Sequence, residues 1–325
     1  MKNKLKHLVP VLLALATITG SLSACELKPK AQQKVSKQGF YFDTIIQITL
    51  YGTTDEKYID DCFDMAKKYE NMLSNTVSYS EVSKINDAAG KEYVTVSNDT
   101  LDLIKKGIEY GDTSDGRFDI TIGKLSNLWN FSEIAENTDS KDNEVDASVV
   151  PSDAQIQSEL SHVNYRNIQI NGNDVMLTDS KAKLDLGGIA KGFIADKMKA
   201  YLQSKKITSG IINLGGNVLT VGEKSDGSDY TVGIQKPFDE SGEPICTVKI
   251  KDKSVVTSGI YERYYRVDGK LYHHILDTTT GYPVKNNLYS VTIISDSSCD
   301  GDALSTHALL LALIKQRSLS IPFPV

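Results

Sequence analysis

The amino-acid sequence predicts an α+β protein in which mixed β-sheets carry flanking helices. An early β-branched run is followed by apolar residues at helical spacing, and short strand signals dominate the second half, where two further helix signals interrupt them. With 325 residues, of which 40% are hydrophobic, the chain can form one sizeable core or two lobes. The net charge of −6 and the lack of a basic stripe argue against a nucleic-acid partner.

The first elements are a strand and two helices. Residues from Phe42 to Gly52 are β-branched and end at a glycine, which predicts a strand. Residues 55–75 predict an amphipathic helix. Its apolar positions are Ile59, Cys62, Phe63, Ala66, Tyr69 and Leu73. A second helix is expected to begin at Ser97 or Asn98, either of which can act as the N-cap.

The second half is expected to be rich in strands. Residues 132–153 are acidic and polar, so we expect a solvated loop or insertion there. Short strand signals follow at 167–172, 174–179, 210–222, 230–237, 246–259 and 288–296. Helices are expected after Gly188 and around Ala303.

The N-terminus has the pattern of a secretory signal. Lysines at positions 2, 4 and 6 precede an apolar run and small residues before Cys25, so residues 1–24 are expected to be a lipoprotein signal peptide. The ending "LSAC" resembles the bacterial lipobox, which predicts lipidation of Cys25, a flexible tether over residues 25–38 and an extracytoplasmic, membrane-anchored protein. An ordinary cleavage site with a chance cysteine is the alternative. The other cysteines, Cys62, Cys246 and Cys299, have no CxxC spacing and are expected to be free or buried thiols.

A glycine pair opens the helix expected after Gly188. In "KLDLGGIAKGFIADKM" (Lys183 to Met198) a strand-like segment meets Gly187 and Gly188, and helical spacing follows. The amides and positive dipole of such a helix start suit a phosphate, and Lys191 could add charge. A plain turn is the alternative reading.

A second group of polar residues lies between Ser258 and Val284. Two adjacent histidines on a strand point to opposite faces, so at most one is expected to face a site. A satisfied structural role is the alternative for either histidine. The group comprises Tyr261, Arg263, His273, His274 and Asp277.

A third group is "DALST", in which Asp302 and Thr306 lie four residues apart. If the segment is helical, a carboxylate and a hydroxyl share one face and offer hard oxygen ligands, which suits Mg²⁺ better than zinc. The alternative is a helix cap with a neighbouring hydroxyl residue.

Eight ordered motifs together resemble the ApbE family, the FAD:protein FMN transferases. They are "FDTIIQITLYG", "SDGRFDITIGKLSNLW", "LDLGGIAKGFIAD", "INLGGNV", "YTVGIQKP", "TSGIYERYY", "HHILDTTTGYP" and "DALST". The resemblance runs from about Gly39 to Thr306. It implies an ApbE-like, T-fold-related domain over residues 39–325 with an FAD site between two lobes. Because the family pattern normally continues through further strands after this last motif, we expect a domain shortened at its C-terminus.

The resemblance also implies an activity. Members transfer the FMN part of FAD to a threonine of an acceptor protein, with Mg²⁺ as cofactor and AMP as the product, and some hydrolyse FAD to FMN and AMP. The expected acceptor belongs to an extracytoplasmic electron-transfer system. An FAD pyrophosphatase and a non-catalytic flavin-binding surface lipoprotein are the alternatives, and the metal and phosphate residues favour catalysis over the second.

Residue roles follow from the resemblance, motif by motif. Asp185 and Lys191 are expected to contact FAD, and Gly188 to give its main-chain carbonyl to Mg²⁺. Asp302 and Thr306 are expected to complete the metal ligands.

The remaining implied residues border the flavin or handle protons. Arg117, Phe118 and Asp119 are expected to line the flavin site. Asp43, Tyr79 and Ile275 fall near positions that border FAD. His274 is the candidate for proton handling or phosphate contact, because a neutral imidazole can accept the proton of the incoming threonine. A catalytic role of Asp302 in addition to metal binding is the alternative.

Overall fold

A computed structural model of the chain describes residues 33–138, 143–239 and 241–311. The expected signal peptide and Cys25 lie outside the described residues. The first strand, β1 (Lys34–Tyr41), begins before residue 39, so residues 34–38 of the expected tether form part of a strand. Burial alternates along β1, but most of its side chains are polar, because β1 is an edge strand and pairs only with β2 among the described residues.

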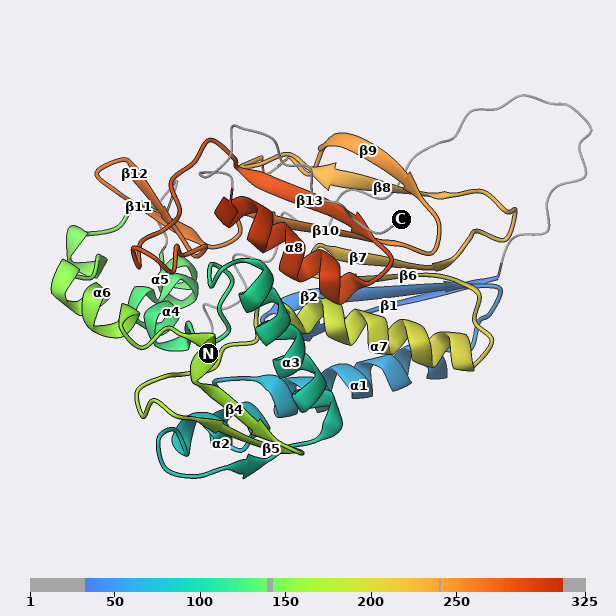
Figure 1. The fold of residues 1–325 in the computed structure, drawn as a ribbon. Helices are drawn as coiled ribbons and strands as arrows, with labels where there is room; N and C mark the ends of the chain where they lie inside the picture. Colours follow the sequence, from blue (N-terminus) through green and yellow to red (C-terminus); the bar gives the residue numbers. More distant parts are fainter. Residues whose placement is uncertain (1–32, 139–142, 240, 312–325) are drawn as a thin grey trace, which may run out of the picture.

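A six-stranded antiparallel sheet forms the centre of the molecule (Figure 1). In spatial order its strands are β1, β2 (Thr44–Tyr51), β6 (Ser209–Leu214), β7 (Asn217–Gly222), β10 (Ser254–Gly259) and β13 (Ser290–Ser295). Ile46, Ile48 and Leu50 alternate along β2 and are fully buried, so burying one face of the sheet fixes the register of this strand.

Three helices cover one face of this sheet. They are α1 (Lys57–Leu73), α7 (Ala190–Ser204) and α8 (Ser298–Leu311), and α3 (Asn98–Thr113) lies beside them (Figure 1). On the opposite face, the hairpin of β8 (Tyr230–Gln235) and β9 (Pro244–Ile250) packs through Tyr230 and Val232 against Ile211 and Val218. The sheet is therefore buried on both sides over its central strands.

Two smaller units flank the sheet. One is a three-stranded sheet with a short helix: β3 (Val94–Thr95), β5 (Asp174–Leu177), β4 (Ile168–Asn171) and α2 (Glu81–Asp87). The other has its own aromatic core, in which Trp129 stacks on Phe131 with ring centroids 5.5 Å apart. It comprises α4 (Gly123–Trp129), α5 (Phe131–Glu136), α6 (Asp153–Leu160), β11 (Tyr264–Val267) and β12 (Lys270–His273), with 3₁₀ turns at Ala147–Val149 and Tyr165–Asn167 nearby.

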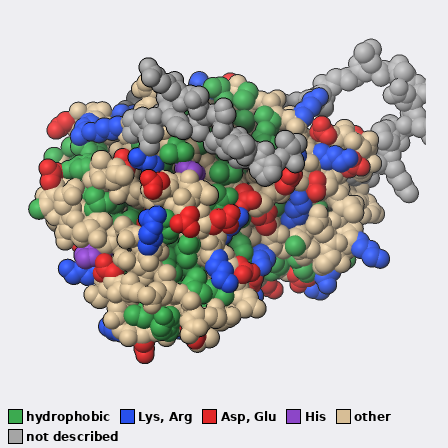
Figure 2. Space-filling view, in the orientation of Figure 1, with side chains coloured by type: hydrophobic (Ala, Val, Ile, Leu, Met, Phe, Trp, Pro, Cys, Tyr) green, Lys and Arg blue, Asp and Glu red, His purple; other side chains and the backbone are tan. Residues whose placement is uncertain are grey.

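Most of the expected elements are confirmed. Ser97 is the N-cap of α3, and its side chain accepts a hydrogen bond from the Thr100 amide. The expectation of a loop over residues 132–153 was wrong in part, because buried Phe131 anchors α5 and Ser152 caps α6 at the end of the segment. In the part of the chain that the structure describes, no helix is both long and apolar enough to span a bilayer. Figure 2 shows acidic and basic side chains interleaved over the face in view.

Candidate active site

The residues expected to act together meet at one end of the central sheet. The antiparallel register places Ile46 opposite Leu214, Leu214 opposite Asn217, and Gly259 opposite Ser290. The turn between β1 and β2, the start of β7, the exit of β10 and the entry to β13 therefore share this end.

Helices α7 and α8 are locked together by two carboxylates. The Gly192 amide, in the first turn of α7, donates to Asp302 Oδ2 at 2.8 Å. In return, Asp196 of α7 accepts from the Ser298 and Cys299 amides at 2.8 and 2.9 Å and so caps α8. The helix start that was expected to be open to a phosphate is thus partly occupied by Asp302, because a buried carboxylate also needs amide donors.

The close approach of these helices requires a glycine. A Cβ on Gly192 would lie 2.2 Å from the Ser298 carbonyl oxygen. No larger residue fits without separating α7 from α8.

Asp302 and Thr306 lie one turn apart on α8, as expected. Asp302 is 7% exposed, and its burial raises the pKa of its carboxyl, while the positive charge of Lys191 acts in the opposite direction. Thr306 Oγ1 lies 3.1 Å from the hydroxyl oxygen of Ser258, at the end of β10.

The glycine pair forms a turn that presents main chain to solvent. Asp185 accepts a hydrogen bond from the Gly187 amide at 2.8 Å, so its carboxylate shapes the turn. Both glycines are exposed. A Cβ on Gly188 would lie 3.2 Å from the ring of Phe118, which places these two expected site residues in contact.

The loop before α4 is tied to the loop after β12. Arg117 Nη1 lies 3.8 Å from Asp277 Oδ1, and the Thr278 hydroxyl donates to the Gly116 carbonyl at 2.8 Å. The "GRFD" and "HHILD" motifs therefore adjoin each other, although they are far apart in sequence.

The two histidines have different environments, as expected. His273 is 4% exposed, accepts from the Ile275 amide through Nδ1 and donates from Nε2 to the Val284 carbonyl, and burial lowers its pKa to about 4. His274 is only partly buried, and its Nδ1 donates to the Arg263 carbonyl at 3.2 Å. Although the ring reaches solvent, crowding by protein atoms, followed by the positive charge of Arg263, lowers the pKa of His274 to about 3. His274 is therefore neutral at pH 7 with an unprotonated Nε2.

Lys191 is close to several other titratable side chains. Its ammonium group acts on the pKa values of Asp302, Glu262 and His274, which come from three separate segments. Glu262 reaches solvent, but crowding by protein atoms raises the pKa of its carboxyl, and Lys191 and Arg263 oppose that rise. Lys191, His274 and Asp302, all expected from the sequence, are thus brought together.

Two expected residues turn inward instead. Asp119 is 7% exposed; its Oδ1 accepts from the Thr121 amide and hydroxyl and its Oδ2 from the Tyr165 amide, so it holds the loop together. The side chain of Ile275 is 5% exposed and packs in a small core with Ile260. A flavin contact through either side chain is not supported by this geometry.

Asp43 and Tyr79 flank the last turns of α1. Asp43 is exposed in the two-residue turn between β1 and β2, and the preceding Phe42 amide donates to Glu70 at 2.8 Å. Tyr79 is 63% exposed and its hydroxyl donates to Asn71 at 2.8 Å. Their roles stay predictions.

Sequence reasoning did not single out three residues of this site. Asp196 caps α8, Asn217 accepts from the Ser298 hydroxyl at 2.6 Å, and Glu262 adds a second carboxyl near Lys191. All three lie within the quoted motifs, but no spacing marks them.

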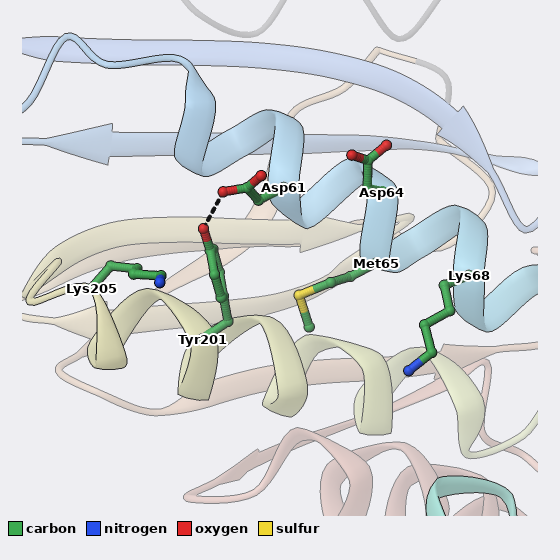
Figure 3. A pocket seen from close by; sticks show the side chains of 6 residues that line it. All are labelled: Asp61, Asp64, Met65, Lys68, Tyr201 and Lys205. Carbon is green, nitrogen blue, oxygen red and sulfur yellow. Dashed lines mark hydrogen bonds between the residues drawn. The ribbon is translucent and has the colours of Figure 1, made fainter. Parts of the chain in front are cut away.

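A separate groove lies between α1 and α7 (Figure 3). Tyr201 donates to Asp61 across it, and Met65, Lys68 and Lys205 also line it. Tyr201 follows Lys191 by about three turns of helix, or roughly 15 Å, so the groove is distinct from the site.

The family model for the ApbE family matches residues 42–320. An FAD:protein FMN transferase of Klebsiella pneumoniae is 38% identical over 263 residues, which are 80% of this chain and 77% of that protein. One from Treponema pallidum is 30% identical over 281 residues, covering 82% and 74%. The crystal structure of the ApbE protein of Thermotoga maritima superposes with a TM-score of 0.79 and 33% identity, over 88% of this chain and 89% of that one. The flavin transferase ApbE of Vibrio cholerae gives 0.73 and 27%, over 86% and 87%.

Proposed function

The chain belongs to the ApbE family, and on that premise we propose that it is an FAD:protein FMN transferase. The observation that carries the proposal is that the start of α7, where Lys191 precedes Gly192, is bonded to Asp302 through the Gly192 amide at 2.8 Å, with Lys191 near enough to His274 to affect its pKa. A site that only held flavin would need neither a cation near a buried carboxylate nor a neutral histidine.

The reaction is a phosphoryl transfer from FAD to a threonine hydroxyl. The hydroxyl oxygen forms a bond to the phosphorus on the FMN side of the pyrophosphate, and the bond from this phosphorus to the bridging oxygen breaks. AMP leaves with the bridging oxygen, and the hydroxyl proton is released. Such a transfer depends on charge neutralisation and on in-line placement of the nucleophile.

The residues of this chain fit these needs. Lys191 supplies positive charge for the pyrophosphate, and the exposed Gly187–Gly188 turn lets a ligand approach the main chain. Because Nδ1 of His274 is held by the Arg263 carbonyl, its Nε2 is the atom that can accept the threonine proton.

The donor set at Asp302 fits Mg²⁺. Among the described residues, no three or more His, Cys, Asp or Glu side chains form a metal-binding group. Mg²⁺ is nevertheless commonly held by one or two carboxylates together with substrate phosphates. Asp302, Thr306 and the Gly188 carbonyl are hard oxygen donors that would hold the ion in this way. When bound, the ion would neutralise charge on the pyrophosphate.

Anchoring to a membrane is part of the proposal. The basic and apolar leader before "LSAC" supports lipidation of Cys25 and an extracytoplasmic location. Cys25→Ala should move the protein from the membrane fraction to the soluble fraction. If its membrane partition is unchanged, lipidation at Cys25 is excluded.

The test of function uses FAD, Mg²⁺ and a peptide with a single threonine. The proposal predicts AMP release in equal amount to peptide that has gained the mass of FMN less one water. A peptide with valine in place of the threonine is the control and should stay unmodified. AMP release with equal free FMN, and no labelled peptide, would identify a pyrophosphatase instead.

A further inference from the structure

Asn217 is buried beside the two helices that form the site. It is the first residue of β7, directly after Gly216, and it is 2% exposed. Its partner across the antiparallel pair is Leu214, whose side chain belongs to the same core as Ile194 of α7. Because paired residues share a face of the sheet, Asn217 also points toward the helices. A carboxamide in this position needs hydrogen-bond partners, since burying it unpaired is unfavourable.

One end of the Asn217 carboxamide is held by α8. The hydroxyl of Ser298, the first residue of α8, donates to Asn217 Oδ1 at 2.6 Å. Ser298 is fully buried, and its carbonyl oxygen is the atom that packs most closely on Gly192. Asp302 follows Ser298 by four residues, so the two side chains lie one turn apart on the same face of α8. A residue that contacts the Ser298 side chain is thus next to Asp302.

The other end of the carboxamide faces Asp302. The donor of this side chain is Nδ2, and within the described part of the chain it makes no hydrogen bond of ordinary length and angle. It is close enough to act on the Asp302 carboxyl: burial raises the pKa of Asp302, and Asn217 is among the groups that oppose this rise. Reversing the amide would turn Oδ1 toward a carboxylate, so the hydroxyl of Ser298 and the charge of Asp302 favour the same orientation.

Two donors from different elements thus approach one carboxylate. The Gly192 amide of α7 donates to Asp302 Oδ2 at 2.8 Å, and Nδ2 of Asn217 approaches from β7. A single hydrogen bond restricts the rotation of a carboxylate only weakly, whereas donors from two sides fix it. Hydrogen bonds from neighbouring groups commonly orient metal-binding carboxylates in this way.

We propose that Asn217 is a positioning residue for Asp302 and fixes the orientation in which this carboxylate receives Mg²⁺. Ser298 holds the carboxamide by its oxygen, and the amide nitrogen holds the carboxylate. The start of β7 is coupled in this way to metal binding, although Asn217 itself contacts neither the metal nor FAD. This inference rests on the proposed function, because that function assigns Mg²⁺ to Asp302.

Asn217→Ala removes the donor, and Asn213→Ala is its matched control. Asn213 lies in the same hairpin, but it pairs with Val218, whose side chain packs on the opposite face of the sheet. Its Oδ1 accepts from the Gly216 amide at 2.9 Å, so the control also loses one side-chain hydrogen bond. Ser298→Ala is a second test, because it removes the hydroxyl that orients the carboxamide and keeps Asn217 itself.

The probe is Mn²⁺, which prefers oxygen ligands as Mg²⁺ does. The full-length protein is loaded with an FAD analogue whose pyrophosphate bridge is a methylene group, so that no turnover occurs, and the paramagnetic resonance signal of free Mn²⁺ gives its Kd. Asn217→Ala should weaken Mn²⁺ binding by about 10–100-fold, Ser298→Ala should weaken it by less, and Asn213→Ala should match the parent. Parental binding by Asn217→Ala would overturn the proposal; if that variant does not fold, parental binding by Ser298→Ala would do so.

A double-mutant cycle separates positioning from general damage to the site. If Asn217 acts through Asp302, Asn217→Ala should add little to the loss of Mn²⁺ affinity caused by Asp302→Asn, whereas losses that multiply would refute the inference. Weaker binding of FAD by Asn217→Ala, measured by flavin fluorescence without metal, together with parental Mn²⁺ binding would mean that Asn217 contacts the substrate, which also refutes it. The Mn²⁺ measurement needs no acceptor, so a protein that only hydrolyses FAD would overturn the proposed function and leave this inference standing.

Discussion

Gly192→Ala tests the contact that places Asp302 in the site. The added Cβ would lie 2.2 Å from the Ser298 oxygen and 2.5 Å from its carbonyl carbon, so main chain must move. Overpacking of this kind costs about 1–3 kcal/mol, and alanine returns about 1 kcal/mol in helix propensity. Separation of the helices also stretches the 2.8 Å bond from Gly192 to Asp302, and a hydrogen bond to a charged group contributes about 1.5–3 kcal/mol. We expect a net loss of about 2–4 kcal/mol in unfolding free energy.

Gly107→Ala is the matched control for this change. Gly107 also lies inside a helix, but its added Cβ would meet only side-chain atoms of Ile120, the nearest at 2.6 Å. Ile120 is buried and β-branched, so overpacking costs about 1–3 kcal/mol, offset by about 1 kcal/mol of helix propensity. No main-chain contact has to open, however, and the bond from Gly192 to Asp302 stays intact, so the net loss should be about 0–2 kcal/mol. Urea unfolding gives both free energies, and flavin fluorescence gives both FAD affinities. If the two variants unfold at the same urea concentration and bind FAD equally, the α7–α8 contact does not control the position of Asp302.

Three further predictions concern individual side chains. Asp302→Asn keeps an acceptor for the Gly192 amide but removes the negative charge, so AMP release should fall by orders of magnitude with little loss of stability. Thr306→Ala should lose less AMP release, because water can replace a neutral ligand. If Asp302→Asn releases AMP at the parental rate, Asp302 is a helix cap only. Lys191→Ala should weaken FAD binding by about 1–3 kcal/mol, measured by titration, and equal affinity would place Lys191 outside the FAD site. The folded pKa of His273, about 4, lies below its ordinary 6.5, so its contribution to stability is complete above pH 6.5 and is lost as the pH falls toward 4. Between pH 7 and pH 5, the unfolding free energy from urea titrations should fall by about 2 kcal/mol more in the parent than in His273→Gln. An equal fall in both proteins would mean that His273 does not titrate in this window.

The parts of the fold that depend on local periodicity were predictable. The buried positions of β2 and α1 repeat at the strand and helix spacings, and Ser97 caps α3 as its position indicated. The N-terminal boundary was missed because the polar sequence of β1, KVSKQGFY, has little apolar alternation even though its burial alternates. The helix α5 was missed because its acidic composition hid buried Phe131.

The site was predictable as a set of residues but not as an arrangement. The motifs named Lys191, His274 and Asp302, yet nothing local says that Asp302 reaches an amide of α7. Nor does spacing show that Asp119 turns inward, since its partners include Tyr165, far along the chain. Contacts between distant segments depend on how helices pack on the sheet, and single-sequence patterns do not contain that geometry.

The most direct test of the central claim is to follow the oxygen atoms during turnover in ¹⁸O-water. The protein is incubated with FAD, Mg²⁺ and a threonine peptide, and the products are analysed by mass spectrometry. Transfer to threonine uses no water, so the flavinylated peptide and an equal amount of AMP should both lack ¹⁸O. Free FMN carrying ¹⁸O beside an unmodified peptide would contradict the account, because water would then be the acceptor.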